Sequence, residues 1–377
     1  MAAIVLVDTL FFAALTPLLP HYAHRLGLGK AGAGLLSAAY PLGALVGAIP
    51  SGIVAARAGV KRTVLVGLTF VAITTALFGI ADTAWQLDLA RFSQGLASAF
   101  SWTGALAWLV AASPAGRRGK LIGGAFGVAI AGAMFGPVLG AVAAYTGTGY
   151  AFGVVGSLAL VLAFAAWRTP AAVPEEPQRL AMLFRALSVR KIQLGVWFTL
   201  LPALLFGNLS VLGPLRLAEL GWGAAAVGVT FLVSAAIEAI WAPVVGHASD
   251  RYGRMPPMRL AVLGSAAVCV LLPWPHNVWA VALLIICGGF AFGSFWTPAL
   301  SMVTDEAESF GLDYGYAFAL VNVAWAPGQA GGAAIGGALA SATSDAVPYL
   351  TLAALCLATF LTVFRYRETA APLAAER

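Results

Sequence analysis

Long apolar runs alternate along this chain with short segments rich in charged residues, proline and glycine. Because a helix needs about 20 apolar residues to cross a bilayer, the runs predict transmembrane helices joined by short loops. Six predicted spans fill the first half, at residues 2–21, 32–55, 63–80, 84–111, 120–144 and 150–168. Six more fill the second half, at residues 192–213, 224–247, 258–275, 278–303, 314–340 and 346–365. The pattern predicts an all-α membrane protein of twelve transmembrane helices in two matching six-helix bundles.

The bundles are predicted at residues 1–168 and 192–377. Residues 169–191 hold prolines and arginines but no long apolar run, so we expect a cytoplasmic linker there, with a surface helix near Leu180–Leu187. The first apolar run lacks the basic start and the small-residue cleavage site of a signal peptide. We therefore interpret that run as the first transmembrane helix, with a preceding cytoplasmic tail missing from the sequence.

Composition supports a membrane protein. Hydrophobic residues make up 61% of the chain and charged residues only 10%, whereas soluble domains have about 25% charged residues. The three cysteines lie within apolar runs, where a thiol behaves as a small hydrophobic group. Neither a disulfide framework nor a metal site is indicated.

The basic residues predict the orientation of the chain in the membrane. Most of the 21 lysines and arginines fall on one side of the predicted helices, the side of both termini. Cytoplasmic loops hold such an excess, so we expect both termini in the cytoplasm and the protein in the cell membrane. The net charge of +6 also favours contact with anionic lipid. Nucleic-acid binding is disfavoured because the basic residues are dispersed and form no single patch.

Two similar loops occupy corresponding places in the two halves. The stronger copy follows the eighth span and contains Gly246, Asp250, Arg251, Gly253 and Arg254. The weaker copy follows the second span and contains Gly52, Arg57 and Gly59. The Gly-x-x-x-Asp-Arg-x-Gly-Arg pattern of the stronger copy resembles the loop signature of the major facilitator superfamily.

This resemblance extends over the whole chain and implies a transporter whose two bundles rock around a central cavity. It also implies that the two loops act in gating. The first copy departs from the family pattern, with Ala56 where the family has aspartate and Val60 where it has arginine. This difference weakens the implied gating role of the first loop. We therefore expect the second copy to hold the cytoplasmic gate.

Asp8 is the leading candidate site residue. It lies in the first span, nine residues before Pro17, and this arrangement resembles the first helix of multidrug and monoamine antiporters, where an acidic residue faces the cavity. Burial favours a protonated carboxyl and an approaching cation favours an ionised one, so one site can exchange a proton for a substrate. Alternatively, Asp8 is a carboxyl near a helix N-terminus, stabilised by the helix dipole and by water.

Glu238 lies in the middle of the eighth span, too deep for a short side chain to reach water. It is predicted to handle protons or substrate from the second half, or to form a structural hydrogen bond there. Arg91 and Gln94 match an Arg-x-x-Gln-Gly pattern that resembles a fourth-helix motif associated with proton coupling. Alternatively, Arg91 forms a fixed ion pair with Asp88, three residues earlier.

Further polar residues are predicted to line the cavity. Asn322, Trp325 and Gln329 share one face of the eleventh span, and three hydrogen-bonding groups on one membrane face rarely point to lipid. Helix-to-helix hydrogen bonding is the alternative for that face. Asn208 and Trp102 are weaker candidates, and Trp102 suits ordinary packing equally well.

The fifth span carries glycine at every fourth position, at Gly132, Gly136 and Gly140, and contains Pro137. Glycine at this spacing allows close approach of another helix, and proline bends the helix. We expect this face to form a sliding surface between the halves. The motif also resembles the fifth helix of drug:proton antiporters, and that resemblance favours export over uptake.

The sequence thus predicts a proton-coupled exporter of an amphipathic, cationic small molecule, acting as a monomer with no cofactor other than the coupling protons. A symporter or facilitator that imports a sugar, amino acid or organic acid is the nearest alternative. A membrane receptor or assembly factor that transports nothing is the alternative of another class. An enzyme is disfavoured, since no nucleotide-binding Gly-x-x-x-x-Gly-Lys-[Ser/Thr] loop is present.

Overall fold

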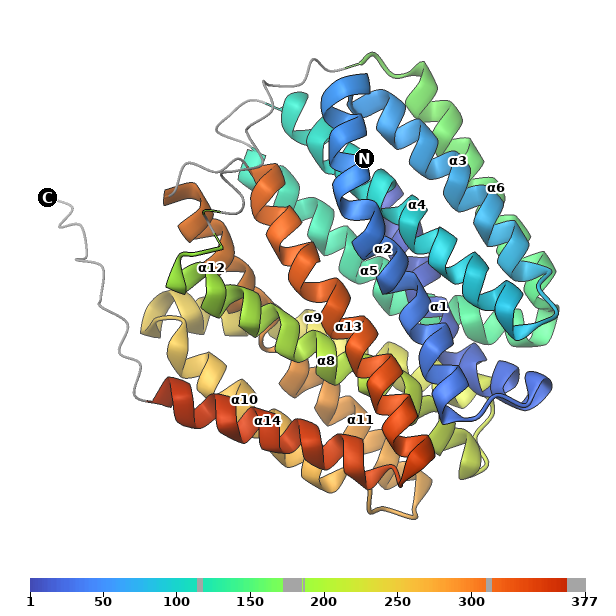
Figure 1. Cartoon of the computed structure of the whole chain (residues 1–377), viewed down its shortest axis with the longest axis vertical. Coiled ribbons are helices and arrows are strands. Elements are labelled where there is room, and N and C mark those ends of the chain that lie inside the picture. The colour runs from blue at the N-terminus through green and yellow to red at the C-terminus, as the bar shows by residue number, and fades with distance from the viewer. Residues whose placement is uncertain (114–117, 172–184, 186, 310–313, 365–377) are drawn as a thin grey trace, which may run out of the picture.

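The structure is a computed structural model that describes residues 1–113, 118–171, 185, 187–309 and 314–364. Most of the predicted linker and of its surface helix lies outside the described residues. Within the described part, every regular element is a helix. Figure 1 shows the helices of both halves packed together.

The N-terminal half contains six long helices, α1 (Ala2–Leu26), α2 (Lys30–Ala58), α3 (Val60–Gly79), α4 (Ala84–Ala111), α5 (Arg118–Thr146) and α6 (Thr148–Arg168). The C-terminal half contains α8 (Arg190–Glu219), α9 (Ala224–Tyr252), α10 (Met255–Leu271), α11 (Val278–Gly293), α12 (Trp296–Ser309), α13 (Tyr314–Ala342) and α14 (Ala346–Phe364). The segment Val278–Ala307, which contains α11 and α12, is one candidate span, so the thirteen described helices correspond to the twelve predicted spans. Within the described residues, nine candidate spans are long and apolar enough to cross a membrane. The predicted fold class is confirmed.

The tenth span is interrupted, although the apolar pattern predicts one continuous helix there. The helix breaks at Ser294 and Phe295, between α11 and α12. Pro298 lies in the first turn of α12, where its missing N–H cannot bond to the carbonyl four residues earlier. Proline is tolerated at such a helix start and not in a helix interior, so the break lies just before it.

Four glycines show that the two halves repeat each other at the level of the backbone. Gly27 and Gly221 follow α1 and α8, and Gly59 and Gly253 follow α2 and α9, each pair 194 residues apart. All four have a positive φ, between 63° and 94°. Because side chains other than glycine rarely adopt this conformation, the same two turns recur in the same places.

The glycine stripes pack within each half and not between the halves. A Cβ atom added at Gly132, Gly136 or Gly140 of α5 would collide with the backbone of α1, including the carbonyl oxygen of Ala14. In the other half, Gly328 and Gly332 of α13 approach the backbone of α8 in the same way. The prediction that the α5 stripe is a sliding surface between the halves is therefore wrong; it makes close contact inside one bundle.

The halves meet mainly through two other helix pairs, α2 with α13 and α5 with α9. At the first, the backbones of Gly34 and Gly337 touch, with no room for a Cβ on either. At the second, Gly228 packs against the carbonyl oxygen of Pro137. Both contacts lie toward the helix ends that the charge pattern predicts to be outside, and the halves pack closely there.

Candidate functional site

Asp8 is buried in the N-terminal half, with 4% of its surface exposed. Three side chains donate hydrogen bonds to its Oδ2 atom: the Tyr40 hydroxyl at 2.8 Å, the Ser98 hydroxyl at 2.6 Å and the Trp102 indole at 2.7 Å. The donors come from α2 and α4, so the carboxyl joins three helices. This geometry contradicts the alternative that Asp8 is a water-exposed carboxyl at a helix end.

Arg91 lies beside this cluster and is equally buried. Its guanidinium donates to the backbone carbonyls of Phe11 and Phe12 on α1, at 3.2 and 3.1 Å. It also lies 4.9 Å from the centre of the Tyr40 ring, close enough for a cation–π interaction. Tyr40 thus contacts the buried cation through its ring and the buried carboxylate through its hydroxyl.

Arg91 does not form the predicted ion pair with Asp88. Both residues are described, and no ion pair joins them among the described residues. Asp88 is half-buried, whereas Arg91 points into the bundle toward α1. The fixed ion pair that was the alternative to a coupling role is therefore wrong in this conformation.

Gln94 supports Arg91 and does not line a cavity. Its side-chain oxygen accepts a hydrogen bond from Arg91 at 3.2 Å, and its nitrogen donates to the Thr75 hydroxyl of α3 at 3.1 Å. Only 2% of its surface is exposed. The prediction of cavity lining is wrong for Gln94, because its amide is held between α3 and α4.

Glu238 is only partly buried and packs against Gly293 of α11. A Cβ at Gly293 would meet the Glu238 carboxyl carbon at 2.8 Å. Among the described residues, none donates a hydrogen bond or forms an ion pair with the Glu238 carboxylate. The structural hydrogen bond proposed as an alternative is therefore not found in the described part of the chain.

An aromatic contact joins the halves near the Asp8 cluster. The Phe12 ring of α1 lies 5.1 Å from the Tyr40 ring and 5.4 Å from the Trp325 ring of α13, measured between centroids. Trp325 is half-buried. Trp325, a predicted cavity residue of the C-terminal half, is therefore connected to Asp8 through the rings of Phe12 and Tyr40.

The side-chain amides of the C-terminal half that were predicted to line the cavity differ in their burial. Asn322 is exposed, whereas Gln329 on the same face is buried. Asn208 is completely buried, and its side chain packs on Gly336 between α8 and α13. The prediction that Asn208 lines a cavity is wrong in this conformation.

The two predicted gating loops differ in their contacts. Arg254 of the second copy forms an ion pair with Asp305 of α12, and Arg251 lies over the Tyr252 ring. Asp250 is exposed, and Gly246 lies against Thr297 of α12. In the first copy, Arg57 is exposed, and a Cβ added at Gly52 or at Gly59 would meet nothing within 4 Å. The better-matched copy is also the one tied to a neighbouring span.

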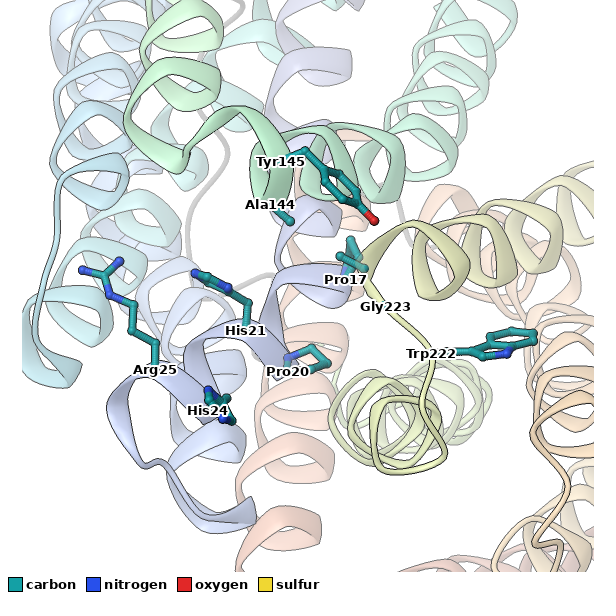
Figure 2. A pocket seen from close by; sticks show the side chains of 10 residues that line it. Pro17, Pro20, His21, His24, Arg25, Ala144, Tyr145, Trp222 and Gly223 are labelled. Atoms are coloured by element: carbon teal, nitrogen blue, oxygen red, sulfur yellow. The ribbon is translucent and has the colours of Figure 1, made fainter.

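One pocket lies at the junction of the halves, beside the end of α1 and the start of α9, with a volume of about 390 Å³. Figure 2 shows its α1 wall, with His21, His24 and Arg25, and the segment with Trp222 and Gly223 opposite. Tyr145 of α5 forms a further wall. None of the predicted site residues lines this pocket, so their access to a central cavity stays a prediction.

Two contributors to the Asp8 cluster were missed in the sequence. Tyr40 lies in a mainly apolar run, with one small polar neighbour, Ser37, at helical spacing, and Phe12 is one of many phenylalanines. The only available signal was Pro41, which follows Tyr40 and bends α2. Ser98, in contrast, lies at helical spacing from Arg91 and Gln94 in the sequence, so it could have been recognised as part of the same polar face.

Helices that match the twelve predicted spans in two repeating halves, with a buried carboxyl and a buried cation inside the N-terminal half, define a membrane transporter. The family model for the Major Facilitator Superfamily matches residues 1–316 and, again, residues 195–377. The chain therefore belongs to the major facilitator superfamily. Members of this family are transporters and not enzymes, and they need no cofactor.

The chain is similar to an uncharacterized MFS-type transporter of Yersinia enterocolitica, with 27% identity over 297 residues, which is 76% of this chain and 75% of the relative. Its fold is similar to that of the nucleoside transporter NupG, with a TM-score of 0.76, 13% identity, and coverage of 97% of this chain and 98% of that one. The xylose transporter XylE from E. coli gives a TM-score of 0.74 at 14% identity, covering 98% and 97%. At these identities the solved structures show the fold alone.

Proposed function

We propose that this protein exports an amphipathic, cationic small molecule in exchange for protons, by alternating access. The observation that carries the proposal is the Asp8 cluster. An acidic side chain is held inside the membrane by three neutral donors, with a buried guanidinium nearby. A charge at this depth costs at least about 2.5 kcal/mol on insertion scales, so a role in binding or coupling explains its presence.

The geometry gives Asp8 one occupied and one available oxygen. All three hydrogen bonds are accepted by Oδ2. Among the described residues, no side chain donates a hydrogen bond to Oδ1. A proton or a substrate cation at Oδ1 would therefore compete for the same carboxyl without dismantling the donors. The rings of Phe12, Tyr40 and Trp325 supply the apolar and cation–π contacts that an amphipathic cation needs.

Glu238 is proposed as a second proton-handling group, contributed by the C-terminal half, and Arg91 as the cation that balances Asp8. The loops with Arg57 and with Asp250, Arg251 and Arg254 are proposed to gate the cytoplasmic side. Both termini are proposed to lie in the cytoplasm of a cell-membrane monomer, on the distribution of lysine and arginine.

Replacement of Asp8 by asparagine tests the proposal in proteoliposomes with an imposed pH gradient. Asparagine keeps the side-chain size but has no ionised form, so Asp8→Asn should abolish proton-coupled export while the melting temperature stays near that of the wild type. Asp88→Asn is the matched control, because Asp88 lies on the same helix as Arg91 but makes no contact with the cluster. Full coupling in Asp8→Asn would reject the proposed role.

Import by proton symport or facilitation is the second candidate. It gains support from the symmetric packing of α5 on α1 and of α13 on α8, because close packing alone accounts for the glycine stripe whose resemblance favoured export. The fold neighbours also include proteins described as nucleoside and xylose transporters. Proton release from the purified protein on addition of substrate favours exchange, whereas substrate uptake accompanied by protons favours symport.

A receptor or assembly factor is the candidate of another class. It predicts that no compound moves across the proteoliposome membrane and that Asp8 and Glu238 are dispensable. A screen of cations, neutral compounds and anions under a pH gradient separates it from both transporter proposals.

A further inference from the structure

Within the described residues, the positive charges that follow the first gating loop have no carboxylate partner, whereas the second loop has one. In the second loop, Arg254 pairs with Asp305. In the first loop, Val60 stands at the position of Arg254, and Ala56 stands where the second copy has Asp250. Lys61 and Arg62 follow directly, and neither forms an ion pair within the described residues.

These two cations line a pocket of about 570 Å³ between the start of α3 and the end of α6. Trp167 of α6 forms part of the same wall. The Lys61 ammonium donates to the backbone carbonyl of Thr169 at 2.8 Å, which fixes it at the edge of the pocket. Arg168 follows Trp167 in the chain and adds a further cation to the end of α6, where its guanidinium lies 4.8 Å from the Phe164 ring. The pocket therefore combines positive charge with an amphipathic aromatic side chain.

Apolar side chains run away from this pocket along the outer faces of both helices. On α3 the exposed positions follow helical spacing, at Val66, Phe70, Ile73 and Leu77, with 39–51% of each residue exposed. On α6 the exposed positions are Val161, Phe164 and Trp167, with 56–60% exposed. Since α3 and α6 pack side by side, the two apolar stripes lie on neighbouring helices. In a bilayer these stripes contact acyl chains.

We propose that the pocket binds the headgroup phosphate of an anionic phospholipid, whose acyl chains lie along the stripes of α3 and α6. A guanidinium and an ammonium are the side chains that recognise phosphate, and tryptophan favours the level of the headgroups. Basic pockets at the ends of transmembrane helices are suited to anionic headgroups. The apolar surface continuing from the pocket favours a lipid over a soluble phosphate, which would leave that surface without a partner.

Quenching of Trp167 fluorescence by brominated lipid tests this proposal. Full-length protein is placed in nanodiscs of phosphatidylcholine that contain brominated phosphatidylglycerol or, separately, brominated phosphatidylcholine. The difference between wild type and Trp167→Phe isolates the Trp167 signal from the other tryptophans. We expect Trp167 to be quenched at lower mole fractions of the brominated phosphatidylglycerol.

The double variant Lys61→Gln/Arg62→Gln should lower this preference on the order of 25-fold, since each basic residue near a membrane surface contributes on the order of a factor of five. The matched control is Arg190→Gln/Arg251→Gln, which removes two exposed positive charges on the same predicted side but outside the pocket. The control should keep the wild-type preference. Melting temperatures of both variants establish that each remains folded.

Three results would overturn the proposal. The first is equal quenching by the two brominated lipids in the wild type. The second is an equal loss of preference in the control and the Lys61/Arg62 variant, which would indicate only the overall charge of that side. The third is loss of the preference in millimolar inorganic phosphate at constant ionic strength, which would assign the pocket to a soluble anion.

Discussion

The ammonium group of Lys30, at the start of α2, lies 2.7 Å from a carboxylate oxygen of Asp345, which precedes α14. The same ammonium lies 3.2 Å from Glu219 at the end of α8. One cation of the N-terminal half is thus held by two carboxylates of the C-terminal half. Just below it, the touching backbones of Gly34 and Gly337 allow the halves to approach this closely.

Reversal of this charge should weaken the closure of the outer side. Lys30→Glu places three carboxylates together, so we expect the outer-open population to increase about fivefold, equivalent to about 1 kcal/mol for partly exposed ion pairs. Spin labels on cysteines introduced at Leu28 and Ser341, in a background without native cysteines, report the separation of the halves. A longer distance component should appear in the variant.

The charge swap Lys30→Asp with Asp345→Lys restores one pair across the interface and should restore the short distance in part. Arg216→Gln is the matched control, because Arg216 pairs with Glu219 inside the C-terminal half. An unchanged distance distribution in Lys30→Glu would show that the packed glycines alone keep the outer side closed.

Loss of one donor to Asp8 should impair transport without unfolding the protein. Trp102→Phe keeps an aromatic ring but removes the N–H that bonds to Asp8. Hydrogen bonds to charged groups contribute about 1.5–3 kcal/mol, so we expect coupled transport to fall at least about tenfold. Transport into proteoliposomes, with the melting temperature measured in parallel, provides the check.

Trp241→Phe is the control for this change, because its indole donates to the Ser294 hydroxyl and not to a carboxylate. It should retain transport within about threefold, as expected for loss of a hydrogen bond between neutral groups. Comparable losses in the two variants would mean that the Trp102 bond has no special connection to the Asp8 carboxyl.

The close approach of α5 to α1 leads to a stability prediction. In Gly140→Ala the added Cβ would collide with the Ala14 carbonyl oxygen, part of a backbone that cannot move independently. Overpacking of this kind typically costs about 1–3 kcal/mol. Gly127→Ala in the same helix meets nothing within 4 Å and replaces glycine by a better helix former, so it should be neutral or stabilising. Thermal unfolding in detergent distinguishes the two variants, and equal melting temperatures would contradict the close packing.

Much of the architecture could be predicted because it depends on signals local in the sequence. The predicted span 84–111 coincides with α4. The loop repeat located Gly59 and Gly253, whose positive φ values of 89° and 85° mark the same turn in both halves. The interruption before Pro298 shows where the hydropathy pattern is insufficient, because apolar residues continue through the break.

The candidate site was predictable only in part, because its geometry depends on which helices pack together. Asp8 and Arg91 attract notice as charges in apolar runs. The burial of Asn208 and Gln94, in contrast, depends on the approach of α13 and α3, which no local pattern reveals. The α5 glycines indicated a close helix contact correctly, but they could not indicate that the partner was α1.

Glu238 provides the last prediction, because its environment allows a structural role to be separated from proton handling. Among the described residues, its carboxylate has no hydrogen-bond or ion-pair partner. A group that stabilises nothing can be neutralised at little cost, so Glu238→Gln should keep the wild-type melting temperature. If Glu238 carries protons, the same variant should lose most proton flux driven by substrate, measured with a pH-sensitive dye inside proteoliposomes.

Gly293→Ala offers an independent way to disturb the same carboxylate without changing its chemistry. The new Cβ would collide with the Glu238 side chain and force it to a different position. We expect proton flux to fall in this variant as well. Gly264→Ala, where the added atom finds an ordinary contact of 3.5 Å with Ala291, should leave it unchanged. Normal flux in both Glu238→Gln and Gly293→Ala would remove Glu238 from the coupling mechanism and leave Asp8 as the proposed proton site.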